Sequence, residues 1–272
     1  MTKNEEWWKH TPTDELLHQT AKLRIVVNRM IALELAKRGD MPFILMQNFR
    51  KLNRTADGWF AMHVPYLLAL RPSNEKLVAL FHVLRRHFDS FGDRIDTDLH
   101  SAFVAFGPDY RGELSWLIKN TEINQKVRAA AFRALVLMIS CEGDREHLLG
   151  LLSEIPNDPV LEDILPFAAL LSKEGLEMAL RMAHDELIAK RIKDAFQWGI
   201  ALNVRKPWDW FDPENLFYLH FTNFGVPSLK GSDMCLCGSR KKLRDCCISA
   251  WHKAKNRSEE YGLNTILLIA EK

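Results

Sequence analysis

The sequence predicts an all-α protein, either a helical solenoid or an irregular helical array, with a small cysteine motif near its C-terminus. Apolar residues recur every three to four positions through most of the chain up to about residue 204. No window alternates with period two for long enough to form a strand. Four of the five cysteines lie within thirteen residues, between Cys235 and Cys247. These three observations separate a large helical part from a short motif.

The composition is that of an ordinary globular protein. Apolar residues make up 47% of the 272 residues, charged residues make up 26%, and the formal net charge is +2. The N-terminal residues lack the apolar stretch of a signal peptide. The longest apolar run, Ile164–Leu171, is too short to cross a bilayer. We therefore expect no transmembrane segment and a cytoplasmic protein whose thiols stay reduced.

The predicted helices follow one another with short connections. Gly39 and Gly107 end two of them, Pro156 follows another, and Ser73 is a plausible N-cap. The predicted ranges are 14–39, 73–88, 97–106, 109–120, 124–139, 144–155, 159–175 and 176–202.

The helix predicted at 124–139 indicates how the array packs. Val127, Ala131, Leu135 and Met138 form one stripe, and small alanines beside it allow a second helix to approach closely. This run resembles the inner helix of a HEAT-type repeat at the following positions: Val127, Arg128, Ala130, Ala131, Ala134 and Leu135. The resemblance implies a HEAT-like solenoid. An irregular helical bundle is the alternative.

Residues 206–230 form an aromatic- and proline-rich connector. Asp212 and Pro213 match an N-cap followed by proline at the first helical position, and Gly225 is a suitable end for that short helix. We expect the aromatic side chains to hold the C-terminal tail against the end of the helical domain. A partner groove lined by aromatic anchors is the alternative.

The cysteines follow the pattern C-x-C-x8-C-C, formed by Cys235, Cys237, Cys246 and Cys247. Four thiolates complete the tetrahedron that zinc prefers and leave no open position, so the pattern predicts one structural zinc per chain. A disulfide between adjacent cysteines would be strained and would be reduced in the cytosol. Iron–sulfur ligands usually have wider spacings. We expect the fifth cysteine, Cys141, to be an inert core thiol at the end of an apolar helix.

The stretch "CLCGSRKKLRDCC" resembles the SEC-C motif, a zinc-binding segment found at the C-terminus of the SecA translocation ATPase and in many other bacterial proteins. It shares the four cysteines together with Gly238, Ser239, Lys241 and Lys242. It departs at Leu236, Arg240 and Leu243, where proline, glycine and an aromatic residue are usual. The helical part is similar to an uncharacterised bacterial family with HEAT-like helices ahead of such a tail. The resemblance implies a docking element, since the SecA tail binds a chaperone.

Basic residues concentrate around this motif. Residues 230–257 contain eight Lys or Arg and only two acidic residues, more than is needed to offset a zinc tetrathiolate. We expect the surplus to bind an acidic protein surface on a chaperone, ribosomal or targeting component. The candidate contact residues are Arg240, Lys241, Lys242 and Arg244, with Leu243 as the apolar centre.

The predicted division of the chain has four parts. A HEAT-like helical domain covers residues 1–205, the connector 206–230, the SEC-C-like motif 231–250 and a C-terminal tail 251–272.

Function is predicted less directly than the metal site. The sequence has no glycine-rich phosphate loop, no HExxH and no nucleophile elbow, so we expect a protein-interaction adaptor rather than an enzyme. One alternative is a nucleic-acid-binding protein that uses its zinc tail and basic helix faces. Another is an enzyme whose site lies in a groove of the helical part. The basic faces are Arg50, Lys51 and Arg54; Arg85, Arg86 and His87; and Lys190, Arg191 and Lys193.

Overall fold

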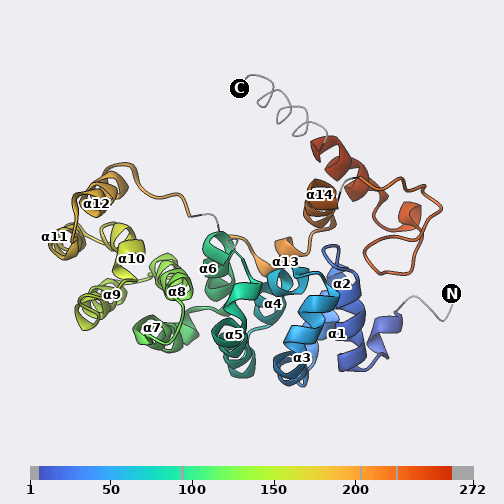
Figure 1. Ribbon diagram of the computed structural model, residues 1–272, viewed down its shortest axis with the longest axis horizontal. Helices are drawn as coiled ribbons and strands as arrows, with labels where there is room; N and C mark the ends of the chain where they lie inside the picture. The colour runs from blue at the N-terminus through green and yellow to red at the C-terminus, as the bar shows by residue number, and fades with distance from the viewer. Residues whose placement is uncertain (1–5, 93–94, 203, 225, 259–272) are drawn as a thin grey trace. The chain divides into compact units, whose positions relative to one another are not determined.

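The computed structural model describes residues 6–92, 95–202, 204–224 and 226–258. Within these ranges the chain is all-α, and its helices pack as an irregular array without a β-strand (Figure 1). An isolated antiparallel bridge joins Met234 to Lys242. The all-α prediction is confirmed. The predicted helix end at Gly225 and the part of the tail beyond residue 258 lie outside the described residues.

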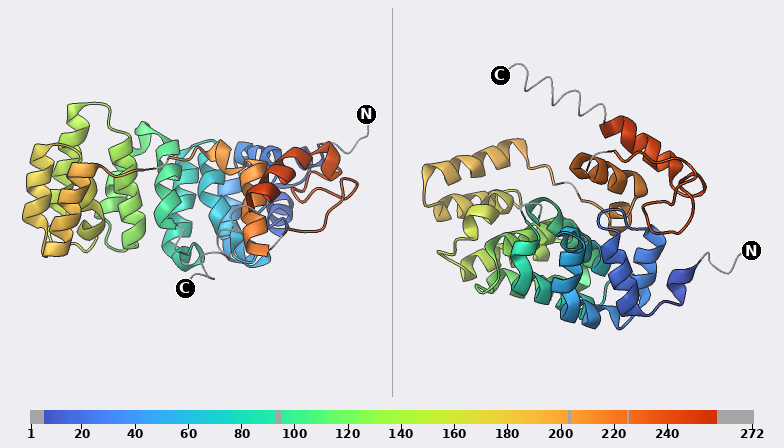
Figure 2. Two further views of the ribbon diagram at one scale, coloured as in Figure 1. Left: turned by 90° about the horizontal axis from the view of Figure 1, so that it is seen from above. Right: turned by 45° about the vertical axis from the view of Figure 1, so that its right-hand side comes forward.

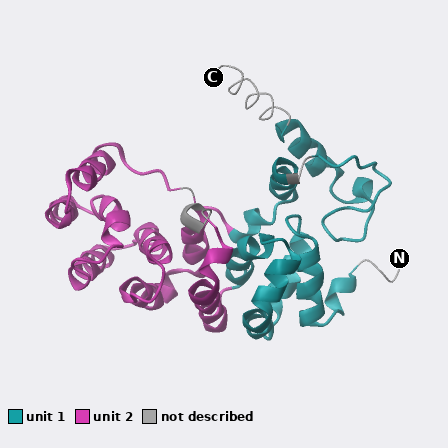
Figure 3. Ribbon diagram, viewed as in Figure 1, with its two compact units in different colours: residues 1–71, 207–272 teal, residues 72–206 magenta. Residues whose placement is uncertain are grey.

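The chain forms two compact units (Figure 3). Unit 1 combines residues 1–71 with 207–272, and unit 2 is residues 72–206. This division differs from the predicted one, in which residues 1–205 form one domain. The connector and the cysteine motif belong instead with the N-terminal helices, because Trp210 and Phe211 of the connector are buried against Tyr66 and His63.

Unit 1 contains a short 3-10 turn, η1, six named α-helices and a further helix described over residues 248–258. The named elements are η1 Trp7–Lys9, α1 Thr13–Lys22, α2 Arg29–Lys37, α3 Met41–Thr55, α4 Trp59–Ala69, α13 Pro207–Trp210, α14 Pro213–Phe224 and a second 3-10 turn, η4 Leu243–Asp245. Helices α3 and α4 are not among the predicted ranges.

The single helix predicted at residues 14–39 is wrong, since α1 and α2 are separated by residues 23–28. Arg24 adopts a left-handed conformation with φ +57°, which ends the first helix. The Asn28 side chain then accepts a hydrogen bond from the Met30 amide at 2.8 Å and caps α2. The break is hidden in the sequence because Ile25, Val26 and Val27 are buried and continue the apolar period.

Unit 2 contains eight α-helices among the described residues. They are α5 Asn74–His87, α6 Ile95–Phe106, α7 Arg111–Lys119, α8 Gln125–Leu137, α9 Glu142–Glu154, α10 Leu161–Ala168, α11 Lys173–Met182 and α12 Glu186–Trp198. Helices α6, α8, α10 and α12 contact one another in that order (Figure 1). The Ser73 cap is confirmed. The two helices predicted at 159–202 are three, because Ser172 and Asp185 each cap a new helix.

Helix α8 is central to unit 2. Val127, Ala131 and Leu135 of its predicted stripe are buried. Arg128 is also buried, and its guanidinium donates to both carboxylate oxygens of Asp158 at 2.8 and 2.6 Å. A buried pair with this bidentate geometry satisfies both charges and joins α8 to the segment before α10.

The aromatic connector packs against α4 inside unit 1. The Trp210 ring stacks on Tyr66 with centroids 4.5 Å apart, and Phe211 is buried beside His63. Further along, Phe221 contacts Trp251 of the 248–258 helix at 5.8 Å. The connector therefore holds the tail against an N-terminal helix, whereas the sequence analysis placed this contact at the end of the helical domain.

His63 joins three segments of unit 1. Its Nε2 donates to the Arg24 carbonyl oxygen at 2.9 Å, and its Nδ1 accepts from Trp210 Nε1–H at 3.0 Å. Only the neutral ring can make both bonds. Burial lowers the pKa of His63 from 6.5 to about 4. The histidine thus connects α4 both to the α1–α2 break and to the connector.

Acidification should destabilise unit 1 through His63. His63 takes up a proton near pH 6.5 in the unfolded chain but only near pH 4 in the folded chain. Its contribution to the free energy of unfolding is therefore fully present above pH 6.5 and is lost as the pH falls from 6.5 to 4. Over that window we expect the wild type to lose about 3 kcal/mol more than His63→Gln, at about 1.4 kcal/mol per pH unit. Urea titrations across this range would measure the difference. The exposed control His252→Gln should follow the wild type, and equal pH dependence in wild type and H63Q would contradict the assignment.

Candidate metal centre

A short turn structure brings the first cysteine pair toward the second. The Cys235 amide donates to the Lys241 carbonyl at 2.9 Å, and the Leu243 amide donates to the Asp233 carbonyl at 2.7 Å. These bonds fold residues 233–243 back on themselves. The 3-10 turn η4, Leu243–Asp245, then places Cys246 and Cys247 just before the 248–258 helix. Adjacent cysteines in such a turn can direct both sulfurs to one side.

The four sulfurs form a compact cluster. All lie within 4.8 Å of one another. The Sγ–Sγ distances are 3.5 Å for Cys237–Cys246, 3.4 Å for Cys246–Cys247 and 3.7 Å for Cys237–Cys247. A tetrahedral zinc site with Zn–S bonds of about 2.3 Å has sulfurs about 3.8 Å apart. The cluster therefore fits one metal ion of that size, and all four cysteines are free of disulfides.

The thiols strongly affect one another's ionisation. Hydrogen bonds, the largest from Cys235, hold the pKa of Cys237 far below its usual range. The same kind of bond, again chiefly from Cys235, lowers the pKa of Cys246 to about 7. Bonding to Cys237 raises the pKa of Cys235, and bonding to Cys235 raises that of Cys247. The cluster accordingly carries negative charge readily but needs a cation to lose all four protons.

Two polar side chains complete the surroundings of the sulfurs. The buried Ser239 hydroxyl lies 3.0 Å from Cys246 Sγ. Asn28 Nδ2 donates to Cys237 Sγ at 3.5 Å from a position 209 residues earlier in the chain. Such donors stabilise thiolates and orient metal ligands. Asn28 is not among the predicted site residues, because its only local signal in the sequence is that of a helix cap.

The cysteine loop contacts the break between α1 and α2 (Figure 2, right). The Asn28 amide donates to the Cys237 carbonyl at 3.0 Å. Gly238 has φ +77°, and a Cβ built on it would lie 2.5 Å from Leu23 Cδ1. Glycine is therefore favoured at 238 both by the backbone conformation and by the close approach of Leu23.

The structure separates the predicted basic contact residues into different environments. Arg240 has φ +58°, in keeping with the glycine that is usual there in the SEC-C motif. Its guanidinium lies 3.9 Å from the centre of the Trp7 ring, and it donates to Gln19 Oε1 at 3.4 Å. Lys241 is half-buried, whereas Lys242 and Arg244 are exposed. Arg240 is thus engaged within unit 1.

Two sequence expectations need correction. Leu243 is fully buried, so it cannot supply the apolar centre of a partner contact; its side chain belongs to the core under the loop. Cys141 is exposed at the N-terminus of α9 and is not a core thiol, because the apolar stripe of α8 ends before it. The exposed apolar side chain near the basic residues is instead Met234, which is 56% exposed and pairs with Lys242 across the bridge.

The predicted basic helix faces lie on three separate helices. Arg50, Lys51 and Arg54 are exposed on α3 of unit 1. Arg85 and Arg86 are exposed on α5, where Arg85 forms an ion pair with Glu122. Lys190, Arg191 and Lys193 are exposed on α12.

The fold and the site together define an all-α protein with a C-terminal four-cysteine cluster able to bind a metal ion. No protein-family model, curated protein or solved structure matches the chain significantly. Among the described residues, every helix is too short or too polar to cross a membrane.

Gly238→Ala should loosen the cysteine loop. The left-handed conformation costs a non-glycine residue roughly 1–2 kcal/mol, and the added methyl group must displace Leu23. We expect metal affinity, measured by competition with a chromogenic chelator, to fall roughly 5- to 30-fold. Leu23→Ala alone should retain affinity, and the double variant should recover part of the loss. If Gly238→Ala binds metal as tightly as the wild type, neither the left-handed backbone conformation of residue 238 nor the close approach of Leu23 affects metal binding.

Proposed function

We propose that the four cysteines hold one structural zinc ion and that the protein is an interaction adaptor with a basic, zinc-stabilised docking loop. The supporting observation is the sulfur cluster itself. Its separations match a tetrahedral tetrathiolate site, in which no coordination position is left for substrate or water. When bound, zinc supplies cross-links between the two halves of the loop rather than a reactive centre.

The zinc would hold a segment that cannot stabilise itself. Residues 231–250 contain about twenty residues, far fewer than are needed to bury an independent core. Their main apolar contribution is Leu243, and their external contacts include Gln19, Asn28, Leu23 and Trp7. Metal binding would therefore order the loop on the α1–α2 break and leave unit 2 unaffected.

The ordered loop presents a small docking face formed by Met234, Lys242 and Arg244. Lys242 and Arg244 are exposed, and Met234 places an apolar side chain beside them. Two positive charges next to an adaptable apolar side chain suit a protein surface that combines carboxylates with an apolar patch. Because the loop is already ordered, little conformational entropy is lost on binding.

The resemblance to the SEC-C motif supports a chaperone, ribosomal or targeting component as the partner. A reducing compartment such as the cytoplasm also fits this proposal, since zinc coordination requires the thiols to remain unpaired.

Purified protein should contain one zinc per chain, and Cys246→Ser/Cys247→Ser should contain none. Elemental analysis measures this directly, and Cys141→Ser should retain one equivalent because Cys141 lies outside the cluster. Hydrogen exchange would report the structural consequence. In the double variant we expect protection to fall at Asn28, whose amide is bonded to Cys237, and to persist in α8 of unit 2. Zinc retained by the double variant would contradict the site, and loss of protection in α8 would contradict the independence of unit 2.

Lys242→Glu/Arg244→Glu should abolish binding to acidic partners without changing zinc content. Affinity purification with full-length bait, repeated at low and high salt, should show partners that are lost with this variant and weakened by salt. Lys190→Glu/Arg191→Glu on α12 is the matched control. Partners that persist with the loop variant would contradict the docking face. Nuclease-sensitive, salt-dependent retention that is lost only with the α12 variant would instead support nucleic-acid binding.

A further inference from the structure

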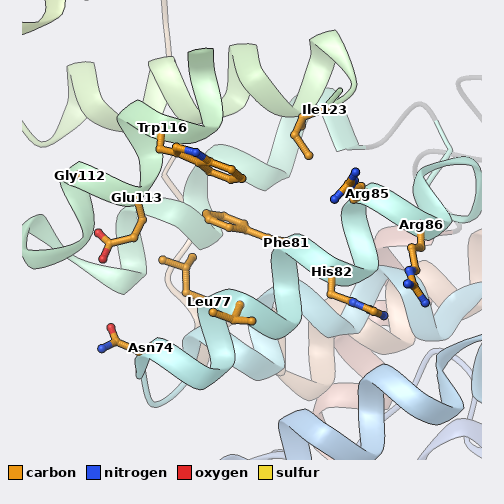
Figure 4. Close-up of a pocket in the computed structure, with 11 residues that line it drawn as sticks. Asn74, Leu77, Phe81, His82, Arg85, Arg86, Gly112, Glu113, Trp116 and Ile123 are labelled. Atoms are coloured by element: carbon orange, nitrogen blue, oxygen red, sulfur yellow. The ribbon is translucent and has the colours of Figure 1, made fainter. Parts of the chain in front are cut away.

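Unit 2 contains a groove between α5 and α7 that is independent of the cysteine cluster (Figure 4). Its volume is about 750 Å³. One wall is a continuous stripe of α5 that runs from Asn74 to Arg86 with spacings of three and four residues, and the other contains Glu113 and Trp116 of α7. The groove thus follows α5 for most of its length rather than forming a compact cavity.

The middle of the groove is apolar and exposed. Trp116 and Val78 are 53% and 59% exposed. The Phe81 and Trp116 rings lie nearly parallel, with centroids 6.4 Å apart and planes inclined by 25°, so they form one aromatic surface across the gap. Leu77 is buried at the base. Tryptophan is enriched among the residues that dominate binding at protein interfaces, and its exposure in an apolar groove suits a docking site.

The two ends of the groove carry opposite charge. Arg85 and Arg86 lie at the C-terminal end of α5, and Glu113 lies toward its N-terminal end, beside Leu77 (Figure 4). His82, between them, has a pKa lowered by burial and by Arg86, so the positive charge of this end comes from the arginines. The ion pair of Arg85 with Glu122 is exposed and contributes little stability, so it can be exchanged for another carboxylate.

We propose that this groove binds an amphipathic helix of a partner protein. The helix would lay an apolar face on Val78, Phe81 and Trp116, place acidic residues against Arg85 and Arg86, and place a basic residue beside Glu113. Leu77 and Arg86 are nine positions apart on α5, so the charged ends of the groove lie about 14 Å apart at about 1.5 Å per residue. This distance corresponds to between two and three turns of the bound helix. Apolar anchors at i, i+3 or i+4 and i+7 would match this length.

The form of the groove favours a helix over other ligands. Small-molecule sites enclose their ligand and direct a few buried polar groups at it, whereas Arg85, Arg86 and Glu113 are exposed at the rim. A nucleic-acid strand would bring a phosphate close to Glu113, which would repel it. A helix with acidic residues near one end and a basic residue near the other complements both charged ends of the groove.

A display library of 16-residue helical peptides, selected on the full-length protein, tests the proposal. We expect selected peptides to share the apolar spacing above and to carry acidic residues near one end. A labelled consensus peptide, followed by fluorescence anisotropy, should bind Trp116→Ala and Val78→Asp at least tenfold more weakly. Arg85→Glu/Arg86→Glu should also weaken binding, and a peptide with lysines in place of the acidic residues should restore it.

Two control variants separate this site from other exposed surfaces. Trp198→Ala removes an exposed tryptophan of α12, and Lys242→Glu/Arg244→Glu alters the cysteine-loop docking face; both should bind the peptide as the wild type does. Selected peptides that bind Trp116→Ala and Val78→Asp unchanged, or a selection that yields no Trp116-dependent peptide, would overturn the proposal. A self-associated protein that becomes monomeric in Val78→Asp would also overturn it and would identify a second copy as the occupant.

Discussion

The two hydrogen bonds between Asn28 and Cys237 join the cysteine loop to the N-terminal helices. One links backbone to backbone, and the other directs a side-chain amide at the thiol sulfur. They form only because the chain breaks at residues 23–28, where a left-handed Arg24 ends α1 and Asn28 caps α2. Without this break, a continuous helix would use the Asn28 backbone N–H internally and remove that donor from the loop.

The same break is supported from its other side by His63 and the aromatic connector. His63 donates to the Arg24 carbonyl and accepts from Trp210, so the conformation of the break depends on a buried neutral ring. Trp210 and Phe211 pack around that ring and connect α13 to α4. The break thus connects the N-terminal helices both to the connector and to the cluster that we propose to bind zinc.

This arrangement assigns different roles to the basic residues of the loop. Arg240 contributes to folding because its guanidinium lies over the Trp7 ring, whereas Lys242 and Arg244 are exposed without a hydrogen bond or ion pair to the described N-terminal helices, and Lys242 pairs with Met234 across the bridge. The α5–α7 groove belongs wholly to unit 2 and uses none of these residues. The two proposed docking sites can therefore be altered separately, which allows the contribution of each to be measured.

The sequence by itself determined the all-α class, many of the helix boundaries and the four clustered cysteines, because apolar period, caps and close cysteine spacing are local properties. Ser73 and Asn124 cap helices through neighbours three residues away or fewer. Only the tertiary structure decided that Leu243 is buried and Cys141 exposed. It also decided that Asn28 contacts Cys237, 209 residues away, and that the N-terminal helices share a unit with the C-terminal loop. These outcomes depend on contacts between distant segments, which local sequence patterns do not report. A buried apolar run such as Ile25–Val27 has the same pattern whether the helix continues through it or ends before it.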